Sequence, residues 1–144
     1  MRPFAAILLV LTLLLAGPAT AANSLREGEY VLHWSAVPTT MLTPEVAKQA
    51  GITRSANRAL VNIAVRRGPD GADVAVAATV RIAVTNLAGQ REVLDVREHR
   101  EGDAIYYLAQ ARTAGEDTLT FEVEALPQGA RPLRTTFRQE FFPQ

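Results

Sequence analysis

Apolar and polar residues alternate with a period of two along most of the chain beyond residue 28. This alternation is typical of strands that bury one face and expose the other. The longest run extends from Val74 to Thr85 and places apolar side chains at every even position. Because strands usually have about 5 to 6 residues, we expect a bend or bulge near Ala77 to Thr79, of the kind that turns a strand around the corner of a sandwich.

Turn residues divide this alternation into separate strands. The segment Gly68-Pro69-Asp70-Gly71, for example, consists of strong turn formers. Residues 23–28 are interpreted as a short leader. The pattern predicts strands over residues 29–37, 59–66, 74–85, 91–98, 104–111, 118–126 and 133–142. About seven short strands predict an all-β fold, an antiparallel immunoglobulin-like β-sandwich, with a β-barrel as the alternative.

One short helix is predicted, from Thr43 to Ala50. Thr43 is a good N-cap, and Pro44 suits the first helical turn, where its missing N–H is not needed. Gly51 can adopt the left-handed conformation that ends a helix. We expect Ile52 to fold back onto the helix from that point.

The strand predicted over residues 104–111 is apolar on both faces, so it should lie centrally in its sheet. The inward faces of the strands supply a predicted core of thirteen residues: Leu32, Trp34, Val61, Ile63, Val80, Ile82, Leu94, Ile105, Tyr107, Phe121, Val123, Phe137 and Phe141.

The first 22 residues have the three parts of a secretory signal peptide. Arg2 precedes an apolar run from Phe4 to Ala16, and small residues favour cleavage after Ala21 or Ala22. As a helix this apolar run would be only about 20 Å long, too short for about 30 Å of hydrocarbon. The sequence therefore predicts export to the periplasm and one mature domain over residues 23–144, without a membrane span.

Composition excludes several classes of protein. The 144 residues carry 15 Lys+Arg and 15 Asp+Glu, 48% of them are apolar, and there is no Cys. The balanced charge argues against a nucleic-acid partner, and the apolar content argues against a disordered chain. Without Cys the mature domain must be held together by packing rather than by disulfides.

The sequence contains no motif that predicts catalysis or a cofactor. It lacks the G-x-S-x-G, H-E-x-x-H, Walker and G-x-G-x-x-G patterns. Its only histidines are His33 and His99, and zinc normally takes at least three protein ligands. A metal-dependent or serine hydrolase built around these histidines is therefore the weakest hypothesis. We expect a non-enzymatic protein with no catalytic residue, no metal and no cofactor.

A polar segment between the predicted helix and the second strand holds most of the candidate binding residues. Arg54 and Arg58 offer planar cationic groups, and Ser55 and Asn57 add neutral hydrogen-bonding groups, a set that suits a carboxylate, a phosphate or a sugar. The alternative is structural, because Ser and Asn often bond their own backbone and an arginine can cap carbonyl groups. His33, on the first predicted strand, is the fifth candidate.

Two segments carry a resemblance to a known family. Gly51-Ile52-Thr53-Arg54-Ser55 and Asp103-Ala104-Ile105-Tyr106-Tyr107 are the most distinctive, within a likeness that extends over nearly all of the mature chain. The chain resembles a family of small exported proteins of Gram-negative proteobacteria known as a domain of unknown function. The resemblance implies a single-domain periplasmic protein and brings no activity or catalytic residue with it.

The sequence supports two main hypotheses about function. The first is a binding or protein-interaction module of the cell envelope, which meets an envelope protein through the loop of Arg54 to Arg58 or through a free edge strand. The alternative is a carrier of a small molecule or glycan, with a pocket near Trp34, Arg54 and Tyr106.

Overall fold

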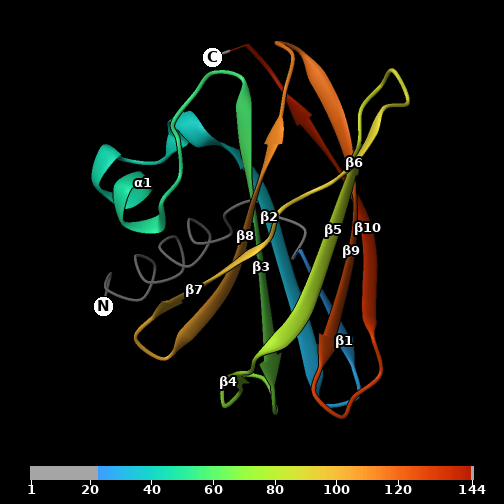
Figure 1. Cartoon of the computed structure of the whole chain (residues 1–144). Coiled ribbons are helices and arrows are strands. Elements are labelled where there is room, and N and C mark those ends of the chain that lie inside the picture. The colour runs from blue at the N-terminus through green and yellow to red at the C-terminus, as the bar shows by residue number, and fades with distance from the viewer. Residues whose placement is uncertain (1–22, 144) are drawn as a thin grey trace, which may run out of the picture.

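Two antiparallel sheets face each other in the computed structural model, which describes residues 23–143 (Figure 1). The predicted signal peptide, residues 1–22, lies outside the described residues. The first sheet has the order β1-β2-β3-β8-β7, with β4 beside β3, and the second has the order β10-β9-β5-β6. The predicted β-sandwich is thus confirmed, and the alternative of a closed barrel is wrong because each sheet keeps two free edges.

The strand bounds follow the predicted alternation closely. The first sheet contains β1 (Ser24–Glu27), β2 (Tyr30–Pro38), β3 (Arg58–Arg67), β4 (Val74–Ala75), β7 (Arg97–Glu101) and β8 (Ala104–Arg112). The second contains β5 (Ala78–Thr85), β6 (Arg91–Val93), β9 (Asp117–Pro127) and β10 (Leu133–Phe141).

Two of the predicted strands cross from one sheet to the other. The run over residues 74–85 divides into β4 and β5, and the break at Val76 and Ala77 confirms the expected bend. The segment predicted as one strand over residues 91–98 is also divided, into β6 beside β5 and β7 beside β8. That prediction was wrong because Leu94 and Val96 continue the inward apolar pattern while the chain passes between the sheets.

The predicted leader is also a strand. Residues Ser24–Glu27 pair with residues 30–33 of β2, and Gly28, at φ 59°, forms part of the connecting turn. Arg26 and Glu27 are exposed, so this short edge strand lacks the alternation that marks the others.

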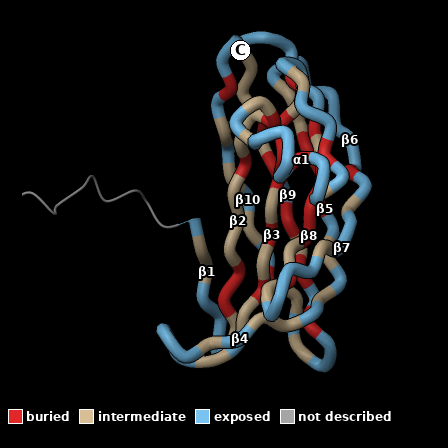
Figure 2. Tube along the Cα trace, turned by 90° about the vertical axis from the view of Figure 1, so that its left-hand side faces the viewer, coloured by how far each residue is buried: buried red, intermediate tan, exposed pale blue. Residues whose placement is uncertain are grey.

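The main core lies between the sheets, and all thirteen predicted core residues are in it or against it. Figure 2 shows the buried residues along the middle of the strands and the exposed ones in the connecting loops. Phe137 of β10 stacks on both Phe121 and Trp34, with ring centroids 5.0 and 5.8 Å apart, so aromatic contacts link β9 and β10 to β2 in the opposite sheet.

A second, smaller core lies on the outer face of the first sheet, under η2 (Thr39–Met41) and α1 (Pro44–Ala50). Thr43 accepts a hydrogen bond from the Val46 N–H, and Gly51 ends α1 at φ 66°, as predicted. Ile52 folds back beneath the helix. The buried members of this core are Ala47, Ile52, Leu60 and Leu108.

This second core explains why β8 is apolar on both faces. One face packs between the sheets, while Tyr106 and Leu108 on the other face lie against the α1 layer. β8 lies between β3 and β7, so it is not an edge strand. In residues 23–143, no helix has the length and apolar character needed to cross a membrane.

Candidate functional site

The loop between α1 and β3 is held in place by a buried threonine. Thr39 has no exposed surface, and its hydroxyl donates to the Ser55 carbonyl at 2.9 Å and accepts from the Ser55 N–H at 2.8 Å. Ser55 in turn accepts from the Asn57 N–H at 3.2 Å through its own hydroxyl. The backbone and the hydroxyl of Ser55 are therefore both engaged in shaping the loop.

Arg54 also makes structural contacts. Its Nε donates to the Leu42 carbonyl at 2.8 Å, and Nη2 donates to the Thr40 carbonyl at 3.3 Å. These two bonds join the loop to the segment between η2 and α1. Of the four candidate residues in this loop, Arg54 and Ser55 thus support the other two.

Asn57 and Arg58 are brought next to the end of β8. The Thr113 N–H donates to the Asn57 carbonyl at 2.9 Å, and Arg58 is the register partner of Arg112. Together with Ala114 these residues line an open concavity of about 430 Å³. Sequence reasoning missed Arg112 and Thr113 because their neighbours are about 55 positions earlier in the chain, and only the strand register brings the two segments together.

The two opposed arginines have no acidic partner. Among residues 23–143 no carboxylate lies within 4 Å of either guanidinium, and neither guanidinium makes a hydrogen bond. Directly opposed residues on neighbouring strands have Cβ atoms about 4.5 to 5.5 Å apart, and like charges there are destabilising. An oxyanion between Arg58 and Arg112 would accept charge-assisted hydrogen bonds from both and remove that repulsion.

A second concavity, of about 320 Å³, continues from Arg58 along the outer face of the sheet. Gln110, two residues before Arg112, lines it, and its Oε1 atom is buried with no hydrogen-bond partner. Glu92 and Asp95 lie on its rim. Cationic donors and one unused amide acceptor therefore meet in neighbouring concavities beside β8.

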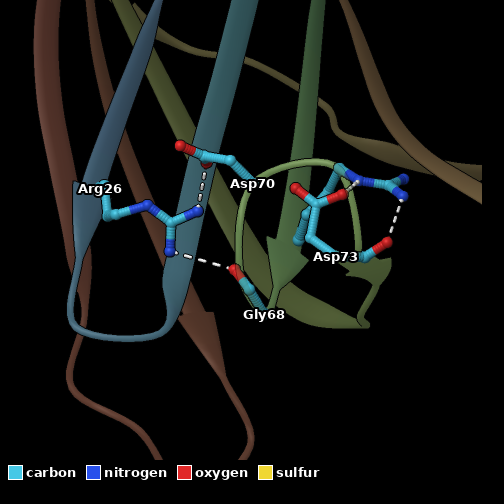
Figure 3. A network of polar contacts seen from close by, with 5 residues as sticks. Arg26, Gly68, Asp70 and Asp73 are labelled. Carbon is cyan, nitrogen blue, oxygen red and sulfur yellow. Dashed lines mark hydrogen bonds and ion pairs between the residues drawn. The ribbon is translucent and has the colours of Figure 1, made fainter.

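Arg66 of β3 and Arg26 of β1, at the other end of β3, are both paired (Figure 3). Arg66 donates to the Asp73 carboxylate and to the Asp73 carbonyl, both at 2.9 Å. Arg26 of β1 donates to Asp70 at 2.7 Å and to the Gly68 carbonyl at 3.1 Å. These bonds fasten the turn between β3 and β4 to β3 itself and to β1, on the other side of β2.

The outer face of the second sheet also carries arginines around a concavity of about 310 Å³. There Arg91 pairs with Glu122 at 3.1 Å, and Arg134 pairs with Glu124 at 2.8 Å. Charges of both signs alternate on this face, which makes it a weaker anion site than the Arg58 and Arg112 pair.

The histidines lie on the outer face of the first sheet but on different strands. His33 is half-buried on β2, and His99 lies on β7 opposite Tyr106, with β3 and β8 between the two strands. His33 is therefore remote from Asn57 and Arg58, because its register partner on β3 is Ala64, six residues beyond Arg58. Within the described range, 23–143, no three His, Asp or Glu side chains are grouped closely enough to share a metal ion.

The carrier pocket predicted near Trp34, Arg54 and Tyr106 is not formed. Trp34 packs against the core between the sheets, whereas Tyr106 lies on the opposite face of the same sheet, under α1. Arg54 is bonded to the α1 connection. The prediction was wrong because the two faces of the first sheet belong to two separate cores, with Trp34 in one and Tyr106 in the other.

One cluster has shifted pKa values. A hydrogen bond from Arg100 lowers the pKa of Glu98, with burial acting in the opposite direction. Burial raises the pKa of Tyr107, whose hydroxyl accepts from the Ala78 N–H at 2.8 Å and donates to Glu98 at 3.3 Å. This network joins β7 and β8 to the start of β5, and its role is structural.

A family described as "Domain of unknown function (DUF4426)" matches residues 24–144. The chain belongs to the DUF4426 family. This confirms the resemblance to a family of that kind over nearly all of residues 23–144. No curated protein matches the chain at a significant level.

Three solved structures are similar to the chain, one of the same family and two of another protein. A DUF4426 protein of Pseudomonas aeruginosa PAO1, PA0388, is similar to the chain with a TM-score of 0.71 and 28% identity, covering 85% of this chain and 96% of its own. FetP of uropathogenic Escherichia coli strain F11, recombinantly expressed in the periplasm, has a TM-score of 0.57 and 11% identity, with 85% and 95% covered. A copper-bound variant of FetP gives 0.58 and 11%, with 86% and 97% covered. At this identity FetP shares the fold of this DUF4426 protein, and the copper is a property of FetP.

Proposed function

We propose that this DUF4426 protein is a non-enzymatic binding module of the periplasm, which holds an anionic group of an envelope partner between Arg58 and Arg112. The observation that carries the proposal is the direct opposition of two arginines that have no acidic partner in residues 23–143. Periplasmic location is supported by the signal-peptide pattern of residues 1–22 and by the likeness to FetP, which was expressed in that compartment.

The residues around the site favour binding over catalysis. Asn57, Arg58, Arg112, Thr113 and Ala114 supply cationic and amide groups, but no imidazole or carboxylate that would act as a general base. The guanidinium groups hold a planar oxyanion by paired hydrogen bonds, which suits a carboxylate or phosphate ester on a protein or glycan. Because Arg112 is exposed, salt should weaken binding.

Site-specific crosslinking in intact cells tests this proposal. A photoreactive residue replaces Ala114 on the rim of the site, and a matched probe replaces Ala72 at the opposite end of β3. We expect the first probe, and not the second, to capture one discrete envelope component. The paired change Arg58→Glu and Arg112→Glu should reduce that product at least tenfold.

The change Arg131→Glu is the charge control, because Arg131 is an exposed arginine outside the site. It should leave the product unchanged. The proposal would be overturned if the variant with both Arg58→Glu and Arg112→Glu still gave the crosslinked product. An identical product from the probe at Ala72 would overturn it as well.

A further inference from the structure

A different surface, the free edge of β10, also lacks a partner. β10 ends the second sheet and pairs only with β9, along all nine of its residues. In Figure 1 the lower part of β10 lies at the right-hand margin of the molecule. The other edge strands of residues 23–143 are shorter: β1 has four residues, β6 three and β7 five. Long unpaired edges attract a further strand.

β10 lacks two of the usual protections of an edge strand, a bulge and a proline, although it carries three charged side chains. Its pairing with β9 runs without interruption from Leu133 to Phe141, so there is no bulge, and the strand contains no proline. Phe137, at its centre, is only partly buried between Phe121 and Trp34. Within β10, one side chain bonds to the backbone of its own strand: the Gln139 side-chain amide donates to the Glu140 carbonyl at 3.1 Å.

The sequence of β10 is complementary to itself in the antiparallel direction. If two copies overlap along all nine residues, a two-fold axis passes through Phe137 and places Arg134 opposite Glu140 twice. Thr135 then lies opposite Gln139. Opposite charges in directly opposed positions stabilise a strand pair, and an aromatic pair at the centre adds to this.

The neighbouring registers are disfavoured by charge. A shift by two residues keeps the same faces aligned but puts Arg134 opposite Arg138 in one direction. In the other direction it puts Arg138 opposite itself on the axis. Since like charges directly opposite each other are destabilising, the full overlap is the favoured alignment of this strand with its own copy.

We propose that this DUF4426 protein self-associates through β10, so that two four-stranded sheets form one continuous sheet across a two-fold axis. The interface is isologous, as in most homodimers, and the axis runs through the Phe137 position. The Arg58 and Arg112 pair lies on the other sheet and stays accessible in this dimer. The inference is therefore independent of the proposed function.

Charge exchange tests the alignment. The mature chain, residues 23–144, is analysed by sedimentation equilibrium over a range of concentrations. Arg134→Glu alone and Glu140→Arg alone should each raise the dimer dissociation constant about tenfold or more, because each turns both attractive pairs into repulsive ones. A mixture of the two variants should restore a dimer, since every Glu at one position then meets an Arg at the other.

Arg112→Glu is the control, because it changes the charge of the other sheet, and it should leave the dissociation constant unchanged. Thermal unfolding of each variant separates loss of association from loss of folding. A wild-type chain that stays monomeric at all concentrations would overturn the inference. Dimers that resist Arg134→Glu, or variants whose mixture stays monomeric, would do the same.

Discussion

β3 begins with Arg58 and ends with Arg66 and Arg67, and the arginines at its two ends have opposite surroundings. At the far end Arg66 is bonded to Asp73, and Arg67 is bonded to Glu29 at 2.9 Å. At the near end Arg58 faces Arg112 with no carboxylate within 4 Å in the described part of the chain. One strand thus shows arginines used to fasten a turn and arginines left available to a ligand.

The comparison teaches that arginine content alone does not identify a binding site. Both ends are rich in arginine, but only one end leaves its guanidinium groups unsatisfied. Thr39, Ser55 and Arg54 build the loop at the near end, so its shape does not depend on Arg58 or Arg112. Substitutions at Thr39 and Arg112 test the near end of β3, a substitution at Asp73 tests the far end, and one at Glu98 tests a paired arginine on another strand.

The largest effect is expected from Thr39→Val. The change keeps the shape of a fully buried side chain but removes the partner of both the Ser55 N–H and the Ser55 carbonyl. We expect the free energy of unfolding to fall by about 2 kcal/mol, because part-buried backbone groups lose their hydrogen bonds. Urea unfolding measures this, with Thr53→Val at an exposed position as control. Equal losses in both variants would contradict the scaffold role of Thr39.

Asp73→Asn tests the paired end. Asp73 is only 19% exposed and Arg66 34%, so this ion pair is better shielded than the others of the domain. We expect a loss of about 1 kcal/mol in the free energy of unfolding, since a charge-assisted bond becomes a neutral one. The control Asp70→Asn removes a pair whose aspartate is 94% exposed, and it should cost less than about 0.5 kcal/mol. The reverse order of the two losses would be inconsistent with this account.

Arg112→Glu tests the unpaired end. With no anion present, it replaces a repulsive pair by an attractive one, so we expect a gain of about 0.5 kcal/mol in the free energy of unfolding. Phosphate should raise the melting temperature of the wild-type chain more than that of the variant. Arg131→Glu serves as the control and should respond to phosphate as the wild type does. Equal responses of the wild type and Arg112→Glu would place phosphate binding elsewhere.

The smallest effect concerns Arg100 on β7, whose hydrogen bond lowers the pKa of Glu98 below its ordinary value of 4.5. A carboxyl group with a lowered pKa in the folded state stabilises the fold above pH 4.5 and loses this contribution as the pH falls through its folded pKa. The stability difference between the wild type and Glu98→Gln should therefore shrink below pH 4.5. Glu101→Gln, on the same strand, is the control, and a difference independent of pH would refute the assignment.

The sequence predicted the sandwich, the helix and thirteen residues of the main core because period-two alternation and helix caps are local signals. It did not predict the second core under α1, whose residues come from the outer faces of β3 and β8 and from the helix. It missed β1, whose exposed Arg26 and Glu27 interrupt any alternation, and the division of residues 91–98 between two sheets. Where the chain passes from one sheet to the other, its inward-facing residues remain apolar. A residue such as Leu94 therefore gives no sign that the strand has ended.

The candidate site was half predictable. Asn57 and Arg58 stand out as polar residues in a loop, and they line the site. In the sequence Arg54 and Ser55 looked equivalent to Asn57 and Arg58, but in the structure they hold the loop in shape. Arg54 bonds to carbonyl groups of η2 and of the segment that follows it, and the sequence does not show that the chain brings these carbonyls within its reach. Arg112 became relevant only through the register of β3 and β8, a contact between distant parts of the sequence.

The chain passes between the two sheets three times, from β4 to β5, from β6 to β7 and from β8 to β9. Peeling one sheet from the other would pull on all three connections and on the paired strands that they join. The domain should therefore open as a single cooperative unit. Amide protons at the centres of β3 and β9, although they belong to different sheets, would then exchange with solvent through the same global event.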